Sequence, residues 1–241
     1  MARPLIGITP DAGTTLERPG RPALPRYELK QNYIEAIVEA GGTPLILPYL
    51  EDDDAIEQVV QLCQGLVVSG GGFDVPPAFY GAEPHPQLGP LNPQRSRFEQ
   101  RVVRKALARD LPILGVCGGM QILAVELGAT LVQDLPSEAK SDVDHEQKFD
   151  PREPAHDVRI LPRSLLARVT GVEAMRVNST HHQAVKTPGR TVPIAHAADG
   201  SVEAIELRGA KFVLGVQWHP ELMRAPEHRA IYRGVVEAAG G

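Results

Sequence analysis

Hydrophobic positions in the first half of the chain follow two alternating patterns. Short apolar runs of strand length lie at residues 5–9, 44–47, 65–69 and 111–116. Between them, apolar residues recur every three or four positions, as in amphipathic helices, over residues 32–40, 54–63, 93–108 and 118–127. Asp54, with Glu57 three residues later, is the expected cap of the second helix. Strands that alternate with helices predict a parallel sheet covered by helices on both faces.

The second half is richer in strands. Candidate strands lie at residues 156–161, 174–177, 193–196, 202–207 and 212–218, and a last helix is expected over about 226–238. No internal repeat or interdomain linker is visible. We therefore predict one α/β domain over residues 1–241. Its expected fold is a three-layer flavodoxin-like fold, with a central, mostly parallel sheet and additional strands in the second half.

Residues 70–93 interrupt the alternation. They contain three consecutive glycines and six prolines, so little regular structure is expected there. Loops of this length are usually functional or disordered. The hypothesis is that this segment forms a wall or lid over a site.

Composition narrows the class of protein. The chain has 241 residues, 42% of them hydrophobic, and its net charge of −5 without a basic stripe argues against nucleic-acid binding. No apolar run reaches the roughly 18 residues of a transmembrane helix, so we expect no membrane segment. Two cysteines, Cys63 and Cys117, make no disulfide framework, which favours a reducing, cytoplasmic setting. Cys63 lies in the apolar stripe of a predicted helix and is expected in the core.

Cys117 lies in a different setting, the sequence Gly115-Val116-Cys117-Gly118-Gly119, where a predicted strand meets a predicted helix. This is the pattern of a nucleophile elbow with cysteine in place of serine. The helix start favours a thiolate, and the Gly118 N–H would point towards an oxyanion. Gly71 and Gly72, after the neighbouring strand, are candidates for the second donor. The alternative is that Cys117 is a small buried hydrophobe beside a tight turn.

A base and its orienting partner are found in the sequence Trp218-His219-Pro220-Glu221. If the strand before it is parallel to the strand before Cys117, His219 lies at the same edge of the sheet. Glu221 is two residues on and projects to the same side of an extended segment, where its carboxylate could fix the imidazole tautomer. The alternative is a surface histidine with a solvated glutamate. Together the two segments supply what a cysteine nucleophile requires.

Six further histidines are considered as metal ligands: His145, His156, His181, His182, His196 and His228. Adjacent side chains in a strand point opposite ways, so His181 and His182 are poorly placed to chelate one ion. No HxxxH helix pair or CxxC motif is present, and we expect no metal. Two alternatives stay open for the polar segment 177–183: it is a solvated connection, or one of these two histidines faces a pocket.

These residues resemble a known group. The chain is similar to the class I glutamine amidotransferase-like superfamily and, within it, to the γ-glutamyl-γ-aminobutyrate hydrolase family of peptidase C26 type. The resemblance is carried by YIEAIVEAGGTPLILP (33–48), SGGGFDVPPAFYG (69–81), VNSTHHQAV (177–185), DGSVEAIE (199–206) and GVQWHPE (215–221), with residues 4–9 and 112–135. Two positions depart from the family pattern. Gly118 stands where Arg is usual, and Ser96 replaces an acid, so both put the substrate preference in doubt.

The resemblance implies a cysteine hydrolase that cleaves a γ-glutamyl amide, with the triad Cys117, His219 and Glu221, and without a cofactor or metal. It implies Gly71, Gly72 and Gly118 as oxyanion donors. The substrate-binding residues it suggests are Gln121, Asn178, Ser179, His181, His182 and Gln183. The expected partner is a small γ-glutamyl molecule, in a role such as polyamine (putrescine) catabolism, and a homodimer is considered. The alternatives are a glutaminase subunit that supplies ammonia to a separate synthase, and a non-catalytic binding protein that kept the fold.

Overall fold

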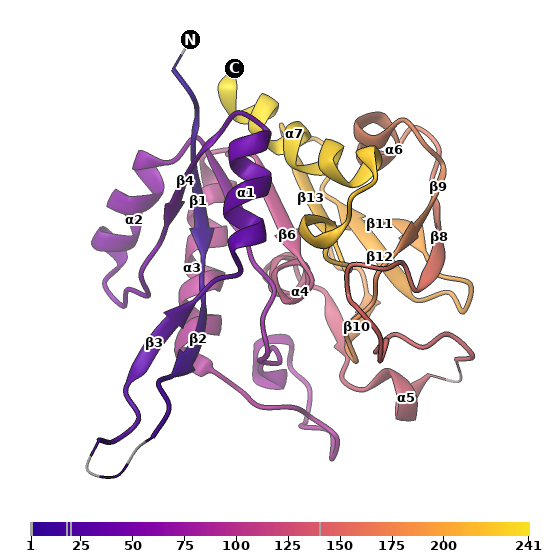
Figure 1. Cartoon of the computed structure of the whole chain (residues 1–241), viewed down its shortest axis with the longest axis horizontal. Coiled ribbons are helices and arrows are strands. Elements are labelled where there is room, and N and C mark those ends of the chain that lie inside the picture. The colour runs from indigo at the N-terminus through magenta and orange to yellow at the C-terminus, as the bar shows by residue number, and fades with distance from the viewer. Residues whose placement is uncertain (1, 18, 20, 140) are drawn as a thin grey trace.

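A computed structural model describes residues 2–17, 19, 21–139 and 141–241 of the chain (Figure 1). The strands of its main sheet are β1 (Leu5–Thr9), β4 (Thr43–Ile46), β5 (Gly65–Val68), β6 (Ile113–Val116), β7 (Thr130–Val132), β8 (His156–Ile160), β9 (Ala174–Val177), β10 (Ala184–Thr187), β11 (Val192–His196), β12 (Val202–Glu206) and β13 (Val213–Val216). The helices are α1 (Gln31–Glu39), α2 (Asp53–Leu62), α3 (Pro93–Ala108), α4 (Gly118–Glu126), α5 (Leu135–Glu138), α6 (Leu165–Thr170) and α7 (Pro226–Gly240). Two short 3₁₀ turns are η1 (Pro77–Tyr80) and η2 (Pro220–Leu222).

The main sheet joins strands from both halves of the chain in the order β4-β1-β5-β6-β13-β12-β11-β8-β9, and β10 links β12 to β7. The five strands from β4 to β13 are parallel, whereas the pairs beyond β13 are antiparallel. The predicted α/β class with a central parallel sheet and extra strands in the second half is therefore confirmed. In Figure 1 the antiparallel strands β8, β9, β11 and β12 lie together on one side of the parallel ones.

Apolar side chains fill both faces of the sheet. One cluster packs β1 and β6 against α1 and α7, with Ile8, Ile37 and Ile231 fully buried. The other packs α2, α3 and α4 against the opposite face, around Ile56 and Phe98. Alternate residues of the central strands point to opposite clusters, which gives the near-continuous apolar runs that the sequence shows. Cys63 packs in the second cluster, as predicted.

The sequence prediction of the α2 cap was wrong by two residues. The cap is Asp52, which has an extended backbone and accepts a hydrogen bond from the Ala55 N–H at 2.8 Å, while Asp54 lies inside the first turn. Several short elements were also missed: β7, β10, α5, α6, and the hairpin of β2 (Asp11–Thr14) with β3 (Pro25–Glu28). The loop 70–93 is irregular as expected, apart from η1. No helix within the described ranges is both long enough and apolar enough to cross a membrane.

Candidate active site

Cys117 stands at the junction of β6 and α4, at the carboxyl edge of the parallel strands. Its φ of 53° and ψ of −113° form a conformation that costs a residue with a Cβ about 1–3 kcal/mol. Gly119 permits this turn, because a Cβ at that position would collide with the Val68 carbonyl oxygen on the neighbouring strand. The strand–turn–helix geometry predicted for this segment is confirmed. It puts Cys117 at the start of α4, where the helix dipole favours an anion.

His219 follows β13, which pairs in parallel with β6, so His219 and Cys117 leave the sheet at the same edge. Nδ1 of His219 lies 2.7 Å from Oε1 of Glu221, whose side chain is fully buried. Because a carboxylate only accepts hydrogen bonds, this contact places a proton on Nδ1. Nε2 is thereby left as the nitrogen that can exchange a proton with a thiol.

Charge around His219 favours its protonated form. Burial alone would lower the pKa of His219, but the negative charges of Glu221 and Cys117 and the hydrogen bonds to them raise it from 6.5 to about 10. Two tyrosines complete the surroundings: Tyr33 Oη lies 3.5 Å from His219 Nδ1, and Tyr232 Oη donates to Glu221 Oε2 at 3.5 Å. Burial, followed by the charge of Glu221, raises the pKa of both tyrosines well above 10, so they remain neutral.

Asn178 holds the backbone of His219. Its Oδ1 accepts from the His219 N–H at 2.8 Å, and its Nδ2 donates to the His219 carbonyl at 3.1 Å and to the Pro151 carbonyl at 2.6 Å. Asn178 is fully buried. The side chain therefore fixes the residue that carries the base, rather than touching a ligand itself.

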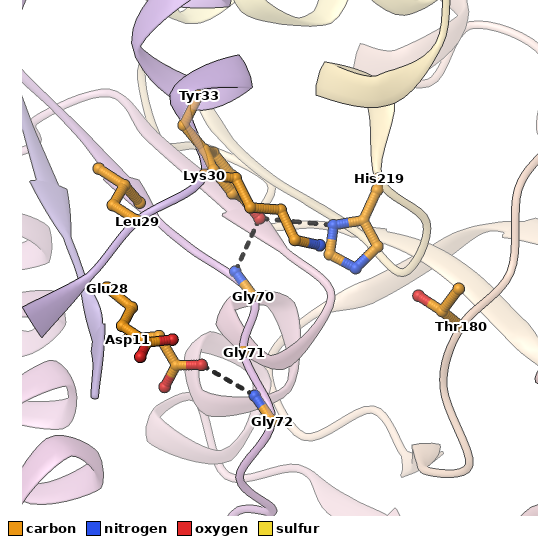
Figure 2. Close-up of a pocket in the computed structure, with 10 residues that line it drawn as sticks. All are labelled: Asp11, Glu28, Leu29, Lys30, Tyr33, Gly70, Gly71, Gly72, Thr180 and His219. Atoms are coloured by element: carbon orange, nitrogen blue, oxygen red, sulfur yellow. Dashed lines mark hydrogen bonds between the residues drawn. The ribbon is translucent and has the colours of Figure 1, made fainter. Parts of the chain in front are cut away.

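Gly70 lies between the nucleophile and the base. A Cβ on Gly70 would lie 2.8 Å from Cε1 of His219 and 3.1 Å from Cβ of Cys117. Its N–H donates to Tyr33 Oη at 2.9 Å, and the same hydroxyl faces His219, as Figure 2 shows. The structure thus brings the three predicted triad residues together around a position with no room for a side chain.

Of the three glycines predicted as oxyanion donors, Gly71 and Gly118 stay the candidates. Gly118 opens α4, so its N–H has no partner within the helix, and a Cβ on Gly118 would lie 3.9 Å from the Gly71 nitrogen. The Gly72 N–H, by contrast, already donates to Asp11 Oδ2 at 3.0 Å. Because the Gly72 N–H is already used by Asp11, Gly72 is a poorer candidate for an oxyanion donor than Gly71 and Gly118.

A buried ion network supports the glycine loop from behind. Arg95 is only 4% exposed. Its Nε donates to Glu99 Oε1 at 3.0 Å, and its Nη1 forms an ion pair with Asp11. Its Nη2 donates to the Ser69 carbonyl, just before the glycine loop, at 2.9 Å. Asp11 in turn receives the Gly72 N–H. A Cβ on Gly71 would collide with the Arg95 guanidinium, so the loop and the arginine fit only while residue 71 is glycine.

Two glutamine side chains form a chain of contacts that ends at the nucleophile. Gln217 Nε2 donates to Cys117 Sγ at 3.7 Å, and Gln121 Nε2 lies 3.3 Å from Gln217 Oε1. Gln121 is only 4% exposed and also contacts the Gln183 carbonyl. Gln121, predicted to lie near a glutamyl group, therefore contacts Cys117 only through Gln217. The side chain that contacts the Cys117 sulfur directly is that of Gln217.

The predicted substrate-binding segment lies mostly behind the pocket wall. Ser179 and His181 face His145, Gln183 Nε2 donates to the Gln133 carbonyl, and His182 sits between Asp74 and Asp134. From this segment, the cavity beside His219 is lined by Thr180 alone. Asn178, Ser179, His181, His182 and Gln183 are thus not among the residues that line this cavity, and their contact with a substrate stays a prediction. Most of their polar atoms instead bond to partners inside the protein, although His181 Nε2 and Gln183 Oε1 have none among the described residues.

The cavity beside His219 has a volume of about 440 Å³. Glycines 70–72 line it, together with Asp11, Glu28 and Lys30 from the segment between β1 and α1 and with Tyr33 from α1 itself. Figure 2 shows the Lys30 side chain extending towards the His219 ring, with Thr180 on the other side of that ring. Asp11 is paired with Arg95 and Glu28 with Arg26, whereas no ion pair joins Lys30 to a carboxylate in the described part of the chain.

Sequence reasoning missed four of the residues that form this site: Asp11, Lys30, Tyr33 and Gln217. Gln217 had a usable signal, because it lies two residues before His219, and such residues share one side of an extended segment. Tyr33 fits the apolar face of a helix and so carried no signal of its own.

The two positions that depart from the family pattern lie in different places relative to the cavity. Gly118 borders Gly71. Ser96 is buried in α3, where its hydroxyl donates to the Asn92 carbonyl, and it does not line the cavity.

The chain is similar to known proteins in sequence and in fold. The family model of peptidase C26 matches residues 4–221. The chain belongs to the peptidase C26 family. A Rickettsia prowazekii protein named as glutamine amidotransferase-like is 35% identical over 92% of each chain, and γ-glutamyl-γ-aminobutyrate hydrolase of Escherichia coli K12 is 32% identical over 80% of this chain and 78% of its own.

Solved structures extend the likeness in fold. The crystal structure of a candidate GMP synthase component from Thermoplasma acidophilum has a TM-score of 0.66 at 18% identity, and the match covers 99% of this chain and 94% of that one. At this identity the likeness concerns the fold alone. Taken with the peptidase C26 match, the chain is a class I glutamine amidotransferase-like hydrolase.

Proposed function

We propose that this peptidase C26 enzyme hydrolyses a γ-glutamyl amide, such as γ-glutamyl-γ-aminobutyrate, to glutamate and a free amine. The observation that carries the proposal is the contact of His219 with Glu221 at the sheet edge where Cys117 occupies its strained turn. A buried carboxylate that orients a histidine beside a cysteine supplies a nucleophile, a base and a tautomer-fixing group. The E. coli relative named for this activity supports the choice of substrate class.

In the first step the Cys117 thiolate attacks the γ-carbonyl carbon, a C–S bond forms, and negative charge develops on the carbonyl oxygen. The N–H groups of Gly71 and Gly118 stabilise that oxyanion. As the tetrahedral intermediate collapses, the C–N bond breaks and His219 gives its Nε2 proton to the leaving amine. The product on the enzyme is a γ-glutamyl thioester.

In the second step a water molecule gives a proton to His219 Nε2 and adds to the thioester carbonyl. The C–S bond then breaks, which releases glutamate and returns Cys117 as a thiolate beside an imidazolium. Glu221 keeps the proton on Nδ1 throughout both steps. Lys30, at the rim of the cavity and without a carboxylate partner among the described residues, is the proposed contact for a carboxylate of the substrate.

A panel of γ-glutamyl amides tests this proposal, with glutamate release measured for the wild type and for Cys117→Ala. Steady release from γ-glutamyl-γ-aminobutyrate or a related γ-glutamyl amine, lost in Cys117→Ala, is expected. Release at the wild-type rate by the alanine variant would refute the nucleophile. Iodoacetamide gives an independent check, because Cys117 should react faster at neutral pH than Cys63, which packs in the core.

A glutaminase subunit is the second candidate, because the Rickettsia relative carries the name of glutamine amidotransferase-like proteins. The same residues would then act on glutamine and pass ammonia to a synthase. Side-by-side assays with glutamine and γ-glutamyl-γ-aminobutyrate distinguish the two functions. Activity on glutamine that depends on an added synthase would favour the glutaminase, and activity of the isolated chain on γ-glutamyl amines would favour the hydrolase. The considered homodimer remains a prediction, to be checked by light scattering.

A further inference from the structure

Three histidines and one glutamate converge on the far side of the wall that carries Thr180. Glu203 on β12 is fully buried, and its Oε1 lies 3.4 Å from His145 Nδ1, 3.7 Å from His156 Nε2 and 3.6 Å from His181 Nε2. The four residues come from four segments: the loop after α5, strand β8, the β9–β10 connection and strand β12. The ligand atoms of His145, His156 and Glu203 all lie within 4.8 Å of one another.

Four atoms at the centre of this cluster lack a hydrogen-bond partner among the described residues, whereas His145 Nδ1 has a contact of 3.4 Å with Ser179 Oγ. Both carboxylate oxygens of Glu203, Nε2 of His156 and Nε2 of His181 are buried without one among the described residues. The distances of 3.4–3.7 Å to Glu203 exceed those of good hydrogen bonds. A buried carboxylate without partners is costly, and proteins ordinarily pair such a charge or place it on a metal ion.

The opposite nitrogen of each histidine ring already has an oxygen acceptor. His145 Nε2 lies 2.9 Å from Asp199 Oδ2, His181 Nδ1 lies 3.0 Å from the Gln183 carbonyl, and His156 Nδ1 lies 3.2 Å from the Asp157 carbonyl. These acceptors fix the proton on the outer nitrogens, so in the neutral rings the inner nitrogens turn their lone pairs towards Glu203. Histidines that bind metals are oriented by this same arrangement of carboxylate or carbonyl partners.

We propose that His145, His156 and Glu203, whose ligand atoms already lie together, bind one divalent metal ion of the zinc type, and that His181, with Nε2 3.6 Å from Glu203 Oε1, moves in as the fourth ligand. Bonds of about 2.0–2.2 Å in a tetrahedral zinc site separate neighbouring ligand atoms by about 3.4 Å, close to the three distances from Glu203 Oε1. Imidazole nitrogens with one carboxylate oxygen suit zinc better than magnesium or calcium, which prefer oxygen ligands. The proposal departs from the expectation of no metal, which rested on local spacing motifs, whereas these ligands lie far apart in the chain.

The site has a structural role, because four protein ligands close a tetrahedral ion and leave no position for a substrate. It ties the loop of His145 to the β9–β10 connection, which already pair through the His181 N–H and the His145 carbonyl at 2.8 Å. Thr180, which lines the catalytic cavity, lies next to His181. The metal would therefore hold one wall of that cavity in place, whatever substrate the enzyme uses.

Metal content tests the proposal. Tag-free Cys117→Ala protein is used throughout, since the thiol beside His219 is a second place where zinc could bind. The protein is purified without chelator, desalted, and analysed by mass spectrometry of metals, before and after incubation with zinc. We expect about one zinc per chain, and visible bands of tetrahedral cobalt when cobalt replaces zinc.

Ligand variants locate the ion. In the Cys117→Ala background, Glu203→Gln and His145→Ala should each lower zinc affinity at least about tenfold and abolish the cobalt bands. His196→Ala removes an exposed histidine of β11 outside the cluster and should keep both. Circular dichroism shows whether each variant is folded. If the parent protein holds no stoichiometric metal after reconstitution, or if Glu203→Gln retains zinc and the cobalt spectrum, the proposal is overturned and the cluster is a proton-sharing network.

Discussion

Oε1 of Glu221 lies 2.7 Å from Nδ1 of His219, and the glutamate side chain is wholly buried. A carboxylate in this position has two effects on its neighbour. It keeps the proton of the neutral ring on Nδ1, and its charge favours a second proton on Nε2. The pKa of His219 accordingly lies at about 10, above its ordinary 6.5, although burial acts in the opposite direction.

Glu221→Gln should lower activity at neutral pH on the order of 10³-fold, because the tautomer is no longer fixed. It should also move the alkaline limit of kcat/KM. In the wild type the imidazolium persists until the pH rises through about 10, so the donor of the first step is lost only there. Without the carboxylate the pKa of His219 falls, and the limit shifts to lower pH. Rates measured across the alkaline range check this, and an unmoved limit would show that another group sets it.

The same shift has a consequence for stability. The folded pKa of His219 is raised, so its contribution to stability is complete below pH 6.5 and is lost as the pH rises through about 10. Thermal melts of the wild type between these values should show a falling Tm. In Glu221→Gln the part of this slope that comes from His219 should shrink.

Gly70→Ala should abolish most activity while leaving the fold intact. The new methyl group would press on the His219 ring and on Cys117, at 2.8 and 3.1 Å, and separate them. A displacement of about 1 Å at reacting groups costs on the order of 100-fold in rate. Gly240→Ala is the control, since a Cβ there meets no atom closer than 4.0 Å. Full activity in Gly70→Ala would mean that a methyl group at residue 70 does not displace His219 or Cys117, and would contradict this prediction.

The alternation of apolar runs sufficed to predict the parallel strands, because strands such as β5 and β6 are buried on both faces. The elbow at Cys117 and the position of His219 followed from local sequence as well, since each depends on one strand end. Short elements such as β7 and β10 could not be predicted. They are only three and four residues long, and each exists because it pairs with a distant strand.

The walls of the site depended on long-range packing. Asn178 was expected to meet a substrate on the basis of the family resemblance, yet its amide is used by the His219 backbone. Lys30 lies in a stretch that no pattern marked, and it reaches the site only because α1 begins beside the glycine loop. Polarity marked residues 177–183 as a candidate site segment, but it did not show which side of the wall each of their side chains would face.

Lys30→Gln should raise KM for γ-glutamyl-γ-aminobutyrate about tenfold and change kcat little. The reason is that the ammonium contacts a substrate carboxylate equally in ground state and transition state, and loss of such uniform binding appears in KM. A single charge-assisted hydrogen bond contributes about 1.5–3 kcal/mol, which supports a change of this size. Lys148→Gln, at an exposed lysine remote from the cavity lining, is the control. A fall in kcat with unchanged KM would assign Lys30 to the chemistry instead.

Asn178→Ala should lower kcat about 10- to 100-fold, because the His219 backbone loses the side chain that fixes its position. KM should change little, since Asn178 does not line the cavity. The variant also leaves the buried N–H of His219 without its acceptor, a loss of about 1–3 kcal/mol, so a lower Tm is expected. Ser164→Ala is a matched control: Ser164 is also buried and caps α6, through the Ala167 N–H, so its loss lowers Tm without reaching His219. Rates well below both melting temperatures separate the two effects. An equal kcat for the two variants would show that Asn178 contributes to stability alone, whereas a loss confined to Asn178→Ala would show that it positions the base.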